Sequence, residues 1–304
     1  MYGRAWPRFL CWSTLLGASA LLGCDADLPP PQPPAGPLAE ASREYDATTA
    51  GEVTGRVTWA GDLPDAPPFQ AQVSPLSEQT RGPKRAWPNP NAPVIDPQSR
   101  GVGNAVVFLR GVDPRRARPW DFDPARVELR DYQIHIRQDG ADGLVGFVRR
   151  GSRVEMESRQ DVFHALQGRG ADFFALTFPP QAPARGRVLE RAGVVELSSG
   201  AGQFWMRAYL FVDDHPYYAR TAADGRFTLP QAPPGDYDLV CWMPDWREAE
   251  HEIDADTRLV SRLTFRPPPQ VVRRVHIDPG ATVTADFTLS LDAFGIVKRS
   301  SPQE

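Results

Sequence analysis

The sequence lacks the signatures of the common enzyme classes. It contains no Gly-x-Ser-x-Gly nucleophile motif, no phosphate-binding glycine loop and no dinucleotide-binding fingerprint. Its 5 histidines have no metal-ligand spacing, and no two carboxylates can be placed across a cleft. A formal net charge of −4 argues against a general nucleic-acid binder. These absences predict a protein that is not an enzyme and does not bind nucleic acid.

The sequence also lacks an apolar run long enough for a transmembrane helix. Its most prominent apolar run, Phe9 to Leu22, lies near the N-terminus and follows two arginines. It is too short for a transmembrane helix, which needs about 20 apolar residues, but it fits a secretory signal peptide. It ends in the residues LLGC, which resemble a bacterial lipobox. The resemblance implies that residues 1–23 are removed and that Cys24 is lipidated. An ordinary secretory peptide with an incidental cysteine is the alternative.

Lipidation of Cys24 implies a cell-envelope protein held at the periplasmic face of a membrane by two or three acyl chains. Asp25 resembles an inner-membrane retention signal and favours that membrane. Cys11 leaves with the signal peptide, so Cys241 is the only free thiol of the mature chain and no intrachain disulfide can form. Cys241 lies in the apolar run LVCW, which predicts a buried, inert thiol.

Proline-rich segments divide the rest of the chain. Residues 24–50 contain a run that favours polyproline II, and we interpret them as a tether. Residues 63–100 are rich in Pro, Asn and Gln without any apolar period, which predicts a long, loosely structured loop. Residues 292–304 are expected to form a disordered tail.

Short stretches of alternating apolar and polar residues fill the remainder, and no segment has a helical period. Many short strands at regular spacing predict an all-β chain of sandwiches. At 304 residues two domains are expected, and we place them at 51–206 and 207–291, with the first strand able to join the second domain. The expected strands are 52–59, 105–109, 127–136 with a bulge or corner after 129, 144–148, 153–157, 173–178, 194–197, 206–212, 237–242, 257–265, 270–277 and 281–291.

The second domain resembles a carboxypeptidase regulatory-like domain, a transthyretin-like β-sandwich that binds or spaces and carries no catalytic residues. The residues Ala223-Asp224-Gly225-Arg226 predict a hairpin turn. The resemblance rests on three motifs: Tyr218-Ala219-Arg220-Thr221, Asp224-Gly225-Arg226-Phe227, and Pro233-Pro234-Gly235-Asp236-Tyr237 with the strand that follows to Trp242.

Residues 102–212 are similar to the cupredoxin-like half of a two-part envelope family described as methylamine-utilisation-like. The motifs are Val102 to Leu109, Gly151 to Met156, Asp161-Val162-Phe163-His164, Trp205-Met206-Arg207-Ala208-Tyr209 and Asp214-His215-Pro216-Tyr217. The resemblance implies a degenerate cupredoxin-like sandwich followed by the regulatory-like one.

A cupredoxin copper site takes two histidines, a cysteine thiolate and a weak axial methionine. By the resemblance, His164 stands at the early histidine and Met206 at the axial position. The second histidine position holds Gln203 and the cysteine position holds Gly200, so the two strongest ligands are absent. We interpret these positions as vestigial and expect no cofactor. A copper-binding or electron-transfer protein with a site rebuilt from His164 and Met206, with His215 as a further donor, is the alternative; His215 is otherwise expected to be structural.

Tryptophans suggest another kind of site. Trp242 and Trp246 in the segment WMPDWR, and Trp120 beside an arginine-rich loop, could stack on a sugar ring; packing inside the protein is the competing interpretation. The sequence thus leads to a hypothesis: a non-catalytic, lipid-anchored envelope protein that binds or assembles with a glycan or an envelope protein at the membrane surface.

Overall fold

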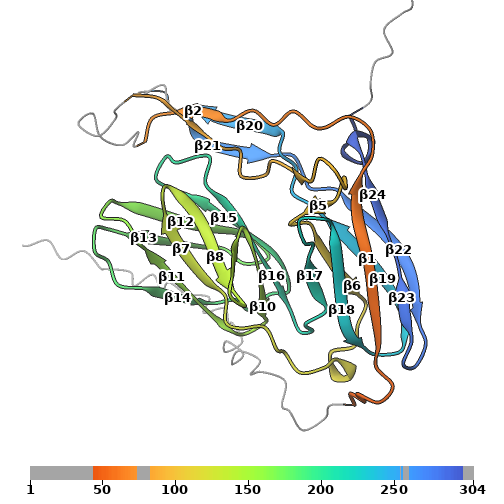
Figure 1. The fold of residues 1–304 in the computed structure, drawn as a ribbon. Helices are drawn as coiled ribbons and strands as arrows, with labels where there is room; N and C mark the ends of the chain where they lie inside the picture. Colours follow the sequence, from red (N-terminus) through yellow and green to blue (C-terminus); the bar gives the residue numbers. More distant parts are fainter. Residues whose placement is uncertain (1–43, 74–82, 254, 256–259, 297–304) are drawn as a thin grey trace, which may run out of the picture. The chain divides into compact units, whose positions relative to one another are not determined.

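The computed structural model describes residues 44–73, 83–253, 255 and 260–296. They belong to one compact unit that begins at Pro37. The predicted signal peptide, the lipidation site Cys24 and most of the tether lie outside the described residues. Within them the chain consists of strands and two 3-10 turns, η3 (Pro114–Arg116) and η4 (Leu291–Phe294), which confirms the all-β prediction (Figure 1). No helix in the described part is long and apolar enough to cross a membrane.

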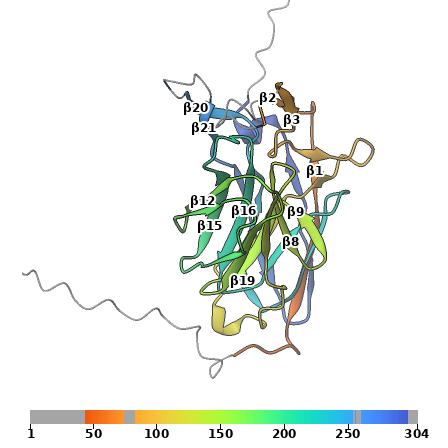
Figure 2. The same ribbon diagram turned by 90° about the vertical axis from the view of Figure 1, so that its left-hand side faces the viewer.

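One sandwich is built from consecutive strands between residues 126 and 213, and we call it the continuous sandwich. Its β7 sheet has the order β14-β11-β7-β8-β9, and its β16 sheet has the order β10-β16-β15-β12-β13. Figure 2 shows β12, β15 and β16 side by side. The strands are β7 (Arg126–Arg130), β8 (Gln133–Gln138), β9 (Ala141–Gly143), β10 (Val145–Arg149), β11 (Arg153–Ser158), β12 (His164–Gly170), β13 (Phe174–Phe178), β14 (Arg185–Val188), β15 (Gly193–Ser199) and β16 (Arg207–Asp213).

The second sandwich takes strands from both sides of the first in the sequence, and we call it the split sandwich. In its β1 sheet, β1 lies between β18 and the parallel strands β23 and β24; its β19 sheet has the order β17-β6-β19-β22. The strands are β1 (Gly51–Trp59), β6 (Val106–Arg110), β17 (Tyr218–Arg220), β18 (Arg226–Ala232), β19 (Gly235–Trp242), β22 (Gln270–Ile277), β23 (Thr282–Thr284) and β24 (Phe287–Leu289).

Three two-stranded ribbons complete the described strands. They pair β2 (Phe69–Ala71) with β3 (Arg85–Trp87), β4 (Val94–Ile95) with β5 (Val102–Gly103), and β20 (Glu248–Ile253) with β21 (Val260–Phe265).

The strand pairing differs from the predicted division at residues 206 and 207. β16 is hydrogen-bonded between β10 and β15 in the continuous sandwich, whereas β1 and β6 belong to the split sandwich. The reason is that β16 is buried on both faces, with six buried residues in succession. An apolar run of that kind does not alternate, so its sequence does not say which sheet it joins.

An aromatic layer covers the second face of β16. Tyr209 and Phe211 of β16 pack against Trp242 of β19, with ring centroids 5.1 and 5.0 Å apart. Phe108 of β6 stacks on Tyr218 of β17 at 5.1 Å in the same layer. The two sandwiches are therefore joined through a third core, separate from the core inside each of them.

Two predicted turns take a different form. The expected bulge after Leu129 is a two-residue hairpin turn, because Asp131 and Tyr132 both have positive φ, 52° and 55°, between the paired Arg130 and Gln133. The turn at Gly225 does not close a hairpin, since β17 and β18 belong to different sheets. Gly225 is nevertheless needed there: its φ is 85°, and a Cβ would lie 2.1 Å from the Val57 carbonyl oxygen.

Two segments expected to lack structure are ordered in part. In the predicted loop 63–100, Phe69 and Trp87 are buried in the core of the continuous sandwich. These two aromatic side chains hold the β2–β3 ribbon in place, and two isolated residues produce no apolar period in the sequence. In the predicted tail, Phe294 packs on Trp246 with ring centroids 4.7 Å apart. The start of the fold also precedes residue 51, since the Glu44 amide donates to the Arg115 carbonyl oxygen at 2.8 Å.

Candidate functional site

His164 begins β12 and is only 1% exposed. Its Nε2 lies 3.2 Å from Gln160 Oε1, and its Nδ1 has no hydrogen-bond partner among the described residues. Burial lowers the pKa of the imidazole below its ordinary value of 6.5. The ring is therefore neutral at pH 7, which is the form that could coordinate a metal.

Gly200 and Gln203 belong to the turn between β15 and β16, which is held by hydrogen bonds within the turn and to β12. The Gly200 amide donates to the Ala165 carbonyl oxygen at 2.7 Å, which places position 200 beside the start of β12. Gln203 is 2% exposed and its Oε1 accepts a hydrogen bond from the Ser199 hydroxyl at 2.8 Å. The Met206 amide donates to the Gln203 carbonyl oxygen at 3.0 Å, and the Met206 side chain is buried in the apolar core.

The β2–β3 ribbon packs aromatic side chains against this turn. Trp87 stacks on Trp205 with centroids 4.5 Å apart and planes 10° apart, and its Nε1 donates to the Ala71 carbonyl oxygen at 3.0 Å. Phe69 meets Phe204 edge to face at 5.7 Å. We call this covered region, from His164 to the Ser199–Met206 turn and its aromatic lid, the closed pole.

Arg207 fastens a second ribbon beside the closed pole. Its buried guanidinium donates to the carbonyl oxygens of Met206, at 2.8 Å, and of Leu263 in β21. Its Nε lies 3.1 Å from Glu196 Oε1, and it covers the Phe265 ring at 5.4 Å. Arg207 thus holds the β20–β21 ribbon against the continuous sandwich together with Leu263, which is buried in the core of that sandwich.

The donor set of the closed pole does not fit a cupredoxin copper centre. It offers one imidazole, one thioether and one amide where such a centre takes two imidazoles and a thiolate. The thiol of Cys241 lies in the other core, that of the split sandwich, where burial raises its pKa to about 12. Within the described ranges, no three His, Cys, Asp or Glu side chains lie together as a metal-binding group.

His215 lies at the junction of the sandwiches rather than at the closed pole. Its ring stacks on Tyr218 at 5.6 Å, and its Nε2 is 3.5 Å from Asp213 Oδ2. Burial lowers its pKa, although the Asp213 carboxylate opposes the shift. Its contacts among the described residues are with Asp213, Tyr217 and Tyr218, not with His164 or Met206.

Two of the three tryptophans singled out from the sequence are enclosed. Trp242 is 2% exposed and packs in the aromatic layer, and Trp246 is 4% exposed, with its Nε1 donating to the Asp65 carbonyl oxygen at 2.9 Å. These rings present no open face to a ligand, as the packing interpretation requires. Trp120 is half-buried and meets Phe122 edge to face at 5.6 Å.

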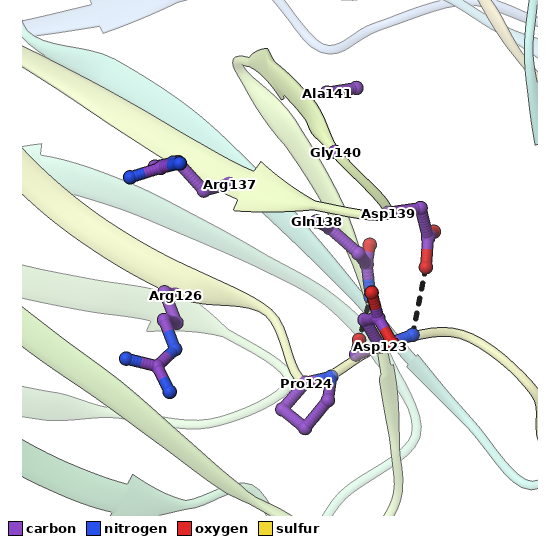
Figure 3. A pocket seen from close by; sticks show the side chains of 8 residues that line it. All are labelled: Asp123, Pro124, Arg126, Arg137, Gln138, Asp139, Gly140 and Ala141. Carbon is purple, nitrogen blue, oxygen red and sulfur yellow. Dashed lines mark hydrogen bonds between the residues drawn. The ribbon is translucent and has the colours of Figure 1, made fainter.

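The structure also contains a pocket of about 370 Å³ at the end of the β7 sheet that the sequence did not reveal. Figure 3 shows the guanidinium groups of Arg126 and Arg137 on one side and Asp123 and Asp139 on the other. Its lining consists of Asp123, Pro124, Arg126, Arg137, Gln138, Asp139, Gly140 and Ala141. We call it the arginine pocket.

Hydrogen bonds fix the floor of the arginine pocket. The buried Gln138 amide donates to the Asp123 and Phe147 carbonyl oxygens at 2.8 and 2.7 Å and accepts from the Phe147 amide at 2.9 Å. Asp139 Oδ1 accepts from the Asp123 amide at 2.8 Å. The Asp139-Gly140 pair, with φ of 51° and 72°, forms the β8–β9 turn and is a recognised hairpin signal that could have located this rim from the sequence.

No protein-family model matches the chain, and no curated protein sequence matches it. Among solved structures it is similar to a purple cupredoxin from Nitrosopumilus maritimus, with 18% identity over 29% of this chain and 98% of the cupredoxin, at a TM-score of 0.22. It is also similar to a copper(I) form of a mutant amicyanin, with 16% identity over 29% of this chain and 79% of amicyanin, at 0.23. A copper-containing nitrite reductase from Thermus scotoductus SA-01 is 12% identical over 34% of this chain and 25% of the reductase, at 0.24. TM-scores of 0.22 to 0.24 are too low to establish the fold or the function of this chain.

Proposed function

We propose that this protein is a lipid-anchored, non-catalytic component of the bacterial cell envelope that binds a glycan or a protein at the membrane surface. The observation that carries the proposal is the closed pole, where a cupredoxin-like protein would hold copper. Gly200 has no side chain that could coordinate a metal. The amide oxygen of Gln203 already accepts a hydrogen bond from Ser199, and Trp87 stacks over Trp205. The pole therefore supports a rigid scaffold rather than a redox centre.

The lipobox residues LLGC support the anchoring part of this proposal. Two or more acyl chains on Cys24 would hold the mature chain stably at a membrane. The junction of the two sandwiches supports the scaffold part, because an aromatic core fixes one sandwich against the other. We propose that the split sandwich is the regulatory-like domain and that Trp120 remains a candidate stacking residue for a sugar.

Membrane fractionation and affinity capture test the proposal together. The wild-type chain is expected in the detergent phase of a Triton X-114 partition, and a Cys24→Ala variant, which cannot be acylated, in the aqueous phase. Mature protein cross-linked in cells is expected to retain one reproducible glycan or envelope protein after solubilisation. An aqueous wild-type protein, or the same partition for both chains, would contradict the anchor.

A copper-binding role with a rebuilt site is the second candidate. One observation favours it: His164 Nδ1 is buried without a hydrogen-bond partner among the described residues. Imidazole and thioether donors suit copper(I). Competition with a chromogenic copper(I) chelator measures this directly, and tight one-to-one binding that Met206→Leu removes would favour the second candidate.

A further inference from the structure

The arginine pocket contains an unusual pair of like charges. Arg126 of β7 and Arg137 of β8 stand directly opposite each other in the antiparallel register. Like charges in that position destabilise a sheet unless a counter-charge lies between them. Both side chains are exposed, so neither is held there by packing.

The carboxylates nearby do not neutralise this pair. Glu128 lies 3.5 Å from Arg137, but it is also shared with Arg130 at 3.5 Å and Arg159 at 3.4 Å. Glu155, the neighbour of Arg126 in β11, pairs instead with Arg153 at 2.7 Å. This wall of the pocket is therefore positively charged, since Arg137 shares its Glu128 contact with two other arginines and the carboxylates of the pocket, Asp123 and Asp139, lie on the opposite side.

The opposite wall accepts hydrogen bonds. Asp123 and Asp139 line it, and an ionised carboxylate has acceptor sites for about four hydrogen bonds, of which the Asp123 amide takes one at Asp139. A ligand that fits both walls has an anionic oxygen group at one end and hydroxyl groups at the other. A volume of about 370 Å³ falls within the roughly 300–1,000 Å³ typical of small-molecule sites.

We propose that the arginine pocket binds an acidic sugar. The oxyanion of the sugar, a carboxylate or a phosphate, is held by Arg126 and Arg137 through charge-assisted hydrogen bonds. Its ring hydroxyls donate to Asp123 and Asp139. The inference rests on the proposed binding function and specifies its ligand class as an anionic glycan.

Calorimetric titration of the mature protein in detergent tests the inference with four probes: glucuronate, glucose 6-phosphate, glucose and inorganic phosphate. Glucuronate or glucose 6-phosphate is expected to bind, glucose not to bind, and phosphate to bind more weakly than the sugar that carries it. Arg126→Gln and Arg137→Gln are each expected to weaken binding by about tenfold or more. Arg187→Gln, an exposed arginine of β14 in the same sheet but outside the pocket lining, is the matched control and should bind like the wild type.

Three results would overturn the inference. They are no binding of either anionic sugar, binding by the Arg126→Gln and Arg137→Gln variants as tight as that of the wild type, and binding of inorganic phosphate as tight as that of glucose 6-phosphate. Thermal unfolding midpoints confirm that each variant is folded before it is titrated. The double variant separates the two proposals. Loss of acidic-sugar binding in the Arg126→Gln/Arg137→Gln double variant supports the inference. If the wild type and all variants partition into detergent and retain a partner but none binds an acidic sugar, the inference fails while the proposed function stands.

Discussion

Trp87 and Trp205 stack almost parallel, with ring centroids 4.5 Å apart, although one belongs to a short ribbon and the other to the turn before β16. Tyr132 meets Trp87 edge to face at 5.8 Å, and its carbonyl oxygen accepts from Trp205 Nε1 at 2.9 Å. A segment without apolar period thus supplies the lid of the closed pole.

Truncation of this lid should be costly. Trp87→Ala is expected to lower the free energy of unfolding by about 3–5 kcal/mol, because it leaves a cavity over Trp205. Trp87→Phe keeps most of the stacking and should cost less. Urea denaturation followed by circular dichroism measures both. A loss for Trp87→Ala within about 0.5 kcal/mol, the range of ordinary surface substitutions, would show that the ribbon is not part of the core.

The Cys241 thiol should be inert in the folded protein. It is buried, and its pKa is raised to about 12 because burial disfavours the thiolate. The mature protein is expected to react with Ellman's reagent only after denaturation, and then with a single thiol, since the proposed acylation of Cys24 would leave Cys241 as the one free thiol. Rapid reaction of the native protein at neutral pH would contradict the burial, and two thiols after denaturation would contradict the lipidation.

Stability should fall in mild acid because of His164. Its folded-state pKa lies below the 6.5 expected of the unfolded chain, so below about pH 6.5 the unfolded state binds more protons. The resulting loss is at most about 1.4 kcal/mol per pH unit for this group. It is absent above that pH, where both states are neutral.

A His164→Gln variant isolates this effect, since its amide can still bond Gln160 without titrating. Denaturation curves at several pH values between about 7.5 and 5.5 are expected to show a flatter stability profile for the variant than for the wild type. Parallel profiles would mean that protonation of His164 does not oppose folding.

The β20–β21 ribbon should loosen without Arg207. Replacement by Met removes the donors to Leu263 and leaves the Glu196 carboxylate without its partner, a change that costs about 3–5 kcal/mol for buried ion pairs. Because Glu196 is partly exposed, the lower end of that range is expected. Amide hydrogen exchange should accelerate across β21, whereas Arg262→Met, which removes an exposed pair with Glu252, should leave it unchanged. Equal exchange in both variants would contradict the role of Arg207.

The sequence predicted the strands well where one face of a sheet is buried. In β7 and β8, Val127, Leu129, Ile134 and Ile136 alternate into one core as expected. In β19, Tyr237 and Cys241 enter the core of the split sandwich while Trp242 enters the aromatic layer, again as the alternation indicated.

Membership of sheets could not be predicted for strands buried on both faces. β6 and β16 are short apolar runs, and an apolar run fits any sheet interior. The lid residues Phe69 and Trp87 had no period to signal them. The arginine pair of the pocket has no signal in the sequence, because Arg126 and Arg137 are eleven positions apart and become neighbours only through the β7–β8 register.

The central claim, that the closed pole is a scaffold without a copper centre, is tested most directly by titrating the mature protein with copper(II) and recording its visible absorption. The account predicts no intense thiolate charge-transfer band, because position 200 is glycine and Cys241 is buried in another core. An intense visible band at one copper per chain that disappears in His164→Gln would contradict it.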